Sequence, residues 1–218
     1  MIYNMDFLIS AMVILLLILW HFLGQKRAED LNNRVFLFFA VLGTADVVAE
    51  FFTNYYITSY NSDMENAAVI VTTIFYLLQA LLPVTFIFYI QTLHEQKIIS
   101  AKKMFISGVP TLVLISVILT NPFTEKLFSF DVTAGYVKGP WYLLMYVSAL
   151  GHFAVALLLI LLWRKKLGPQ KEKILLEIFV ISGVGVVLQM FCQSLLMTGF
   201  GMSLGILALF ITINNPNA

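Results

Sequence analysis

Seven apolar runs, most of them about twenty residues long or longer, recur along this chain and constrain its fold more than any other feature. A helix of that length crosses the hydrocarbon core of a bilayer, where only helices and closed barrels satisfy their own backbone groups. Hydrophobic residues make up 60% of the chain and charged residues only 11%, a balance that excludes a soluble domain. The sequence therefore predicts an all-α, polytopic membrane protein, a bundle of seven transmembrane helices at residues 5–23, 35–57, 67–93, 102–120, 141–163, 174–196 and 197–213.

The distribution of basic residues predicts how this bundle is oriented. Of the 13 Lys and Arg residues, only Lys126 and Lys138 fall in outer loops if the N-terminus lies outside. An excess of Lys and Arg on the cytoplasmic side is the rule for such proteins, so we expect the N-terminus outside and the C-terminus inside. Residues 1–6 contain no Lys or Arg, which argues against a cleavable signal peptide. The net charge of +1 gives no reason to expect a nucleic-acid partner.

A stripe of polar residues interrupts the second apolar run. Asp46, Glu50 and Asn54 recur every four residues, which places them on one face of a helix. Ionisable groups within a membrane are costly, normally face the bundle interior and commonly mark a functional site. We expect Glu50 and Asn54 on the ligand side, and Asp46, which lies deeper, in a structural role. Asp46 is either protonated or paired with His152, the latter if the second and fifth helices meet.

Other polar residues cluster in the outer half of the predicted bundle, whereas the inner half is expected to be almost wholly apolar apart from Thr85, Tyr89 and Ser182. A receptor needs a pocket open to one side, whereas a transporter needs a polar path through both leaflets. The asymmetry favours a receptor for a small extracellular molecule over a small proton-coupled transporter that uses Asp46 and Glu50. Simple hydrogen bonding between helices, in a structural subunit with no cavity, is a third interpretation. The residues expected to bind the ligand are Glu50, Asn54, Tyr76, Gln79, Tyr146, His152, Gln189 and Gln193.

Several local features carry structural expectations. Residues 121–140 form the longest outer loop, which is either a small lid or hairpin over the outer mouth or a plain solvated loop. Pro83 and Pro110 should each bend their helix. Gly201 and Gly205 have the spacing that allows close helix packing. The 196–201 connection is short, so the sixth and seventh helices should form a hairpin.

The sequence lacks the residues that the common kinds of catalytic site require. The chain has no His-Glu-x-x-His zinc motif, and Ser148 and His152 lack a nucleophile motif around the serine. Every lysine lies on a loop or a helix end, which excludes a retinal Schiff base. We therefore expect no enzyme activity in this chain, and no metal or cofactor.

Three stretches of this chain resemble a known family. They are Gln189-Met-Phe with Leu195-Leu-Met-Thr-Gly-Phe-Gly and the final run from Leu207 to Asn214-Asn-Pro; Asn33-Arg-Val-Phe with Asp46 following; and Asn121-Pro-Phe-Thr with Tyr136-Val-Lys-Gly-Pro. Together they resemble the seven-helix N-terminal sensor region of Firmicutes GGDEF proteins. Asn214 stands where that family usually has glutamine.

The resemblance implies a sensor domain at residues 1–213 and a cytoplasmic junction at 214–218 that leads to an output domain in the same protein. It implies a bacterial plasma membrane, an extracellular cue, cyclic di-GMP signalling and a homodimer. Any diguanylate cyclase activity would reside in a C-terminal GGDEF domain, because none of that domain's catalytic residues are present in this sequence.

Overall fold

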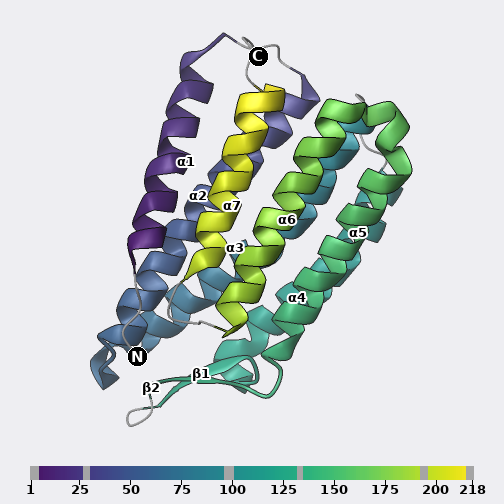
Figure 1. The fold of residues 1–218 in the computed structure, drawn as a ribbon. Coiled ribbons are helices and arrows are strands. Elements are labelled where there is room, and N and C mark those ends of the chain that lie inside the picture. Colours follow the sequence, from purple (N-terminus) through teal and green to yellow (C-terminus); the bar gives the residue numbers. More distant parts are fainter. Residues whose placement is uncertain (1–4, 27–29, 96–100, 132–134, 192–195, 215–218) are drawn as a thin grey trace.

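The computed structural model describes residues 5–26, 30–95, 101–131, 135–191 and 196–214. Within this part the chain forms seven α-helices and one small antiparallel hairpin (Figure 1). The elements run in the order α1 Asp6–Gly24, α2 Leu31–Thr58, η1 Ser62–Met64, α3 Glu65–Glu95, α4 Ala101–Thr124, β1 Phe128–Asp131, β2 Gly135–Lys138, α5 Leu143–Leu167, α6 Pro169–Phe191, α7 Met197–Leu209 and η3, a π-helical turn at Phe210–Asn214.

All seven predicted helices form, and their lengths and composition suit a polytopic membrane protein. Among the described residues, five are long and apolar enough to cross a membrane: α1, α2, α3 with η1, α5, and α7 with η3. In α4 the apolar stretch is shorter and covers Gly108–Thr124. Helix α6 carries charged residues in its first turns. Large apolar side chains such as Trp20, Leu143 and Leu162 are exposed on the outside, as a lipid-facing surface requires.

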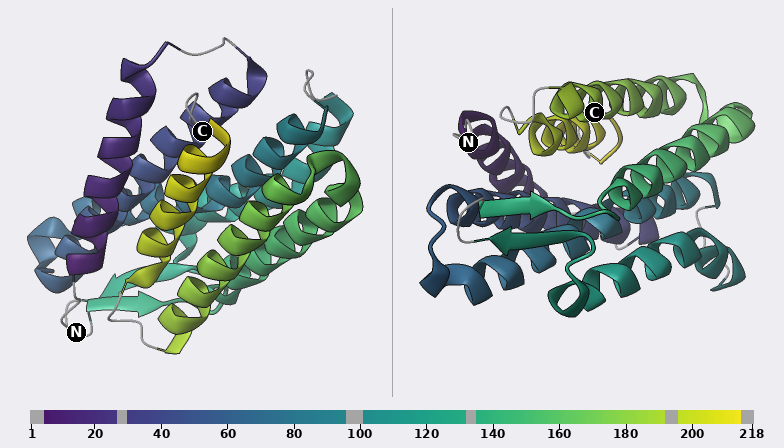
Figure 2. Two further views of the ribbon diagram at one scale, coloured as in Figure 1. Left: turned by 45° about the horizontal axis from the view of Figure 1, so that its top comes forward. Right: turned by 90° about the horizontal axis from the view of Figure 1, so that it is seen from below.

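The helices enclose a space rather than packing as a solid bundle. Contacts run in a ring from α1 to α2, α3, α5, α6, α7 and back to α1, while α4 packs against α3 and α5. Figures 1 and 2 show α1, α7 and α6 side by side in front of α2 and α3. The chain enters α1 at the end of the bundle where the β-hairpin lies and leaves η3 at the opposite end.

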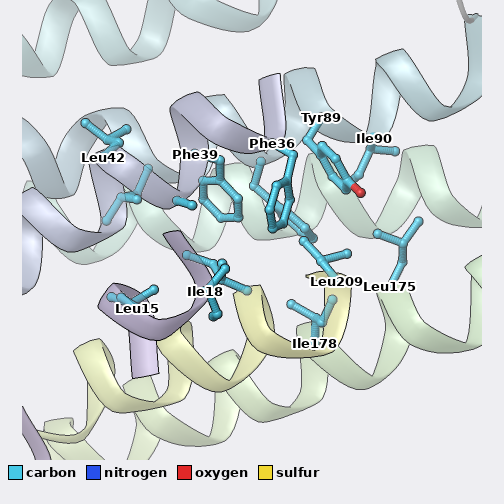
Figure 3. Packing of buried hydrophobic residues seen from close by; sticks show 14 of the residues in the cluster. Leu15, Ile18, Phe36, Phe39, Leu42, Tyr89, Ile90, Leu175, Ile178 and Leu209 are labelled. Carbon is cyan, nitrogen blue, oxygen red and sulfur yellow. The ribbon is translucent and has the colours of Figure 1, made fainter. Parts of the chain in front are cut away.

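An apolar cluster, part of which is shown in Figure 3, includes the end of the bundle away from the hairpin and continues along α1 as far as Leu8. Phe36 of α2 packs against Tyr89 of α3, with ring centroids 6.1 Å apart, and stacks on Phe210 of η3. Leu175 of α6 and Leu209 of α7 are also fully buried in this cluster. Close packing here leaves the interior space to the other half of the bundle.

The loop at 121–140 is a hairpin, which decides between the two alternatives for it. Phe128 pairs with Lys138 and Phe130 with Tyr136. Asn121, at the end of α4, organises its base: its amide nitrogen donates to the Phe128 carbonyl at 2.9 Å, and its side-chain oxygen accepts from the backbone N–H of Leu127 at 2.7 Å. Figure 2 shows the hairpin lying across this end of the bundle.

Helices α6 and α7 pack closely through small residues, as predicted. A Cβ on Gly201 would meet the Ile181 carbonyl at 3.4 Å, and one on Gly205 would meet the Ile178 side chain at 3.0 Å. Helix α6 ends at Phe191, before the predicted boundary, and Leu196 precedes α7 in a left-handed conformation. Pro83 and Pro110 lie inside α3 and α4. The bends expected at these prolines stay predictions.

Candidate functional site

A cavity of about 220 Å³ occupies the half of the bundle that the hairpin covers. Residues of all the helices from α2 to α7 and of the hairpin line it. Its polar lining lies toward the hairpin, and its apolar floor, with Phe39 and Phe86, borders the packed cluster of the other half. A largely apolar cavity with a few converging polar groups is the usual form of a small-molecule site.

The polar stripe of α2 faces this cavity. Asp46, Glu50 and Asn54 are all buried and all line it, together with Thr53 on the same helix. The Asn54 amide nitrogen donates to the Glu50 carbonyl at 2.8 Å, which holds that side chain against its own helix. Oxygen Oδ1 of Asp46 is buried without a hydrogen-bond partner in the described part of the chain. A buried acceptor without a donor costs free energy, so a hydrogen bond from a ligand or a water molecule to this oxygen would be stabilising.

Glu50 connects the cavity to α7. A Cβ placed on Gly199 would lie 2.9 Å from Glu50 Oε2, so the carboxyl group reaches the backbone of the first turn of α7. The first N–H groups of a helix have no partner within it, and the helix dipole favours negative charge there.

Aromatic rings form the outer rim of the cavity. Tyr76 of α3 is hydrogen-bonded through its hydroxyl to Tyr136 of the hairpin, and its ring is 6.3 Å from that of Tyr142. The Tyr142 ring lies 5.6 Å from Tyr146 on α5. Lys138 places its ammonium over Tyr142, 4.6 Å from the ring centroid. Separately, partial desolvation of the side chain lowers the pKa of Lys138 below its ordinary range. Desolvation raises the pKa of the Tyr142 hydroxyl, so it remains a neutral hydrogen-bonding group.

His152 is on the cavity wall but does not pair with Asp46, so that hypothesis is wrong. Its Nε2 lies 2.9 Å from Thr111 Oγ1 of α4, and its Nδ1 lies 2.7 Å from the Ser148 carbonyl. Both ring nitrogens are therefore engaged by α4 and α5. The contacts explain the error: α5 packs against α3, α4 and α6, so its histidine finds a partner on α4.

The structure gathers most of the predicted ligand-binding residues around one space. Glu50, Asn54, Tyr76, Gln79, Tyr146 and His152 all line the cavity, and so does Asp46. The side chain of Gln189 and all of Gln193 lie outside the described residues, as do Cys192 and the junction residues 215–218.

Sequence reasoning gave a hairpin over the outer mouth as one alternative, but it assigned no ligand-binding residue to the hairpin or to α7. Tyr136, Lys138 and Tyr142 line the mouth, and Thr198 and Met202 line the wall next to Glu50. The alternation of aromatic and polar residues after position 127 was the one available signal for the hairpin. The described residues hold no group of three or more His, Cys, Asp or Glu side chains placed to bind a metal ion.

The inner end of the bundle is less apolar than predicted. Tyr89 donates its hydroxyl to Asn214 Oδ1 at 2.6 Å, and Asn214 Nδ2 donates to Asn33 Oδ1 at 3.1 Å. Thr92 donates to Asn32 Oδ1 at 3.3 Å beside them. This buried polar cluster ties η3, the last described turn, to α2 and α3. The prediction of an apolar inner half missed this polar cluster because its asparagines come from opposite ends of the chain.

Comparison of the chain with known protein families, with curated proteins and with solved structures found no match. The resemblance to GGDEF sensor regions therefore stays a prediction, and the geometry of the cavity carries the functional argument.

Proposed function

We propose that this protein is a transmembrane sensor module that binds a small extracellular molecule in the cavity and signals through α7. The observation that carries the proposal is the cavity itself, with polar groups of α2, α3 and α5 at its hairpin end. Its far end is packed by the apolar cluster around Phe36 and Leu209. A pocket with one closed end suits a receptor.

The distribution of basic residues supports the orientation in this proposal, with the hairpin and the N-terminus outside and η3 inside. Ligand binding next to Glu50 then acts on the outer end of α7, whose inner end is held by the Asn214 cluster. A ligand shifts such an equilibrium only through different affinities for two arrangements of the bundle. The resemblance suggests a GGDEF-type output domain, a bacterial plasma membrane and a homodimer, and these remain part of the proposal.

A thermal-shift screen of the purified chain in lipid nanodiscs against sugars, amino acids, amines and short peptides tests the sensor. A ligand that binds only the folded state raises the melting temperature by mass action. Ala149 lines the cavity, whereas Leu150 beside it is exposed on the lipid side. The shift should disappear in Ala149→Trp, which fills the cavity, and persist in the matched variant Leu150→Trp. A ligand whose shift survives in Ala149→Trp binds elsewhere and contradicts the proposal.

The buried carboxyl groups of Asp46 and Glu50 are the observation that favours the alternative, a proton-coupled transporter. Uptake of the identified ligand into sealed proteoliposomes separates the two functions. A sensor shows binding with no uptake above empty vesicles under an imposed proton gradient, and accumulation of the ligand would establish transport.

A further inference from the structure

The charges that line the cavity are unequal. Its walls carry the carboxyl groups of Asp46 and Glu50, and Lys138 is the one lysine or arginine among its lining residues. Lys138 lies at the exposed mouth, over the Tyr142 ring, whereas both carboxyl groups are buried. Two carboxyl groups one helical turn apart in a low-dielectric space can both ionise only when positive charge compensates them.

The two acids differ in how they are compensated. Glu50 lies at the first turn of α7, where the backbone N–H groups and the helix dipole favour a negative charge. Asp46 lies one turn deeper, lines the cavity and is only 4% exposed, and its Oδ1 is buried without a hydrogen-bond partner among the described residues. A donor that carries positive charge satisfies both the hydrogen-bonding capacity and the charge of this oxygen.

The aromatic rim provides a second, independent feature suited to cations. Tyr76, Tyr142 and Tyr146 form a chain of edge-to-face contacts at the cavity mouth. The faces of such rings attract ammonium groups within about 6 Å. Lys138 already uses one of these rings in this way, at 4.6 Å, which shows that the rim accepts an ammonium group.

From these features we propose that the ligand of the cavity is a small organic ammonium ion, which enters past the tyrosine rim and is held by Asp46 and Glu50. This inference rests on the proposed function and specifies its ligand. The volume of about 220 Å³ equals the space of roughly seven water molecules at about 30 Å³ each, which suits an amine of similar size. Phe75, Leu82 and Met145 supply apolar walls for its carbon atoms. Asp46 becomes a binding residue here, in place of the structural role that the sequence predicts for it.

The test compares cations with neutral molecules of the same shape. The purified chain in phosphatidylglycerol nanodiscs, which contain no ammonium headgroup, is titrated with choline and with its neutral analogue, in which a quaternary carbon replaces the nitrogen. Ethanolamine and 1-propanol form a second pair that covers primary amines. Isothermal calorimetry and melting temperature are the readouts. We expect at least one cation to bind at least tenfold more tightly than its neutral partner.

Variants then assign the preference to the cavity. Asp46→Asn and Glu50→Gln should each weaken binding of the cation at least tenfold and leave binding of the neutral analogue unchanged. Tyr146→Leu should weaken cation binding, whereas Tyr146→Phe, which keeps the ring, should retain it. Glu125→Gln, a change at an exposed acid outside the cavity, is the matched control and should bind like the wild type.

The outcomes separate this inference from the proposed function. If both cations bind no better than their neutral partners in the wild type, the ammonium inference is overturned, and this comparison needs no variant to fold. A neutral or anionic compound whose binding disappears in Ala149→Trp would then leave the sensor proposal standing with a different ligand class. If half of the lipid is phosphatidylcholine and the response to added choline is lost, the ammonium group belongs to a lipid headgroup.

Discussion

The carboxyl group of Glu50 in α2 lies against the backbone of Gly199 in α7, and a Cβ at position 199 would be 2.9 Å from Glu50 Oε2. The carboxyl group occupies the space that a side chain at position 199 would take, so any larger residue there forces Glu50 to shift. The contact joins the wall of the cavity to the helix that leads to the opposite end of the bundle. In a sensor, this contact would act on α7 together with Thr198 and Met202, which line the cavity directly.

Gly199→Ala should therefore destabilise the protein and weaken ligand binding. The added methyl group would also lie 3.3 Å from Val47 and 3.4 Å from Leu8, so the Glu50 side chain has to move. Overpacking of this kind costs about 1–3 kcal/mol, of which the helix preference of alanine offsets up to about 1 kcal/mol. Thermal unfolding of the purified variant measures the loss. Gly151→Ala is the control, since a Cβ there meets nothing within 4 Å and alanine favours the helix; a loss of the same size in both variants would contradict the argument.

Tyr89→Phe should loosen the inner end of α7. It removes the hydroxyl that donates to Asn214 Oδ1 and leaves a buried acceptor short of a donor, at a cost of about 1–3 kcal/mol. Hydrogen exchange of residues 206–214, followed by mass spectrometry, should be faster than in the wild type. Tyr55→Phe, at a half-exposed tyrosine of α2, should leave exchange in this segment unchanged. Equal protection in all three proteins would show that this hydrogen bond does not hold η3.

Asn121→Ala should release the hairpin from the end of α4. The side chain bonds the backbone at Leu127 and Phe128, so its loss leaves buried groups of both residues without that partner. We expect faster proteolysis between 125 and 140 and weaker ligand binding, because Tyr136 and Lys138 form part of the rim. Asn66→Ala, at an exposed position of α3, is the control. An unchanged cleavage rate in Asn121→Ala would refute the role given to this side chain.

Lys138 should lose its proton at a lower pH than an ordinary lysine, because its partial burial disfavours the charged form. Because the unfolded state binds the proton more strongly, stability rises as the pH increases from the folded-state pKa to the unfolded value, and this group contributes no pH dependence outside that window. Labelling by an amine-reactive reagent, followed by mass spectrometry across pH 7–11, should reach its half-maximal rate earlier at Lys138 than at the lysine of an unfolded peptide. Tyr142→Leu keeps an apolar side chain but removes the ring face that attracts the ammonium, so it should move the Lys138 profile to a still lower pH.

The orientation can be tested with single cysteines in a Cys192→Ser background. The introduced cysteine of Glu125→Cys, beside the hairpin, should react with a membrane-impermeant maleimide on intact cells, because the positive-inside rule places that end outside. The introduced cysteine of Gln170→Cys, at the start of α6, should react only after the membrane is permeabilised. The reverse pattern would invert the topology and would direct the cavity toward the cytoplasm.

The sequence was sufficient to predict the number of helices, most of their boundaries and the helix face that carries the site. Apolar runs of bilayer length give the helices, and the spacing of Asp46, Glu50 and Asn54 puts these residues on one face whatever the helix packs against. The spacing of Gly201 and Gly205 likewise predicted close helix packing, which the structure shows between α6 and α7. These predictions succeed because each depends on residues that are near one another in the chain.

Only the tertiary structure decided which residues meet across the bundle. His152 bonds Thr111 and not Asp46, Glu50 reaches Gly199, and Asn214 joins Asn33 and Tyr89. Each of these contacts joins different helices, and helical periodicity fixes the face of a helix but not the neighbour that this face meets. The tyrosine rim depends likewise on a hairpin whose register brings Tyr136 and Lys138 over the cavity. The helix faces were therefore readable from local spacing, whereas the contacts between them, and the cavity that they enclose, follow from how the helices pack.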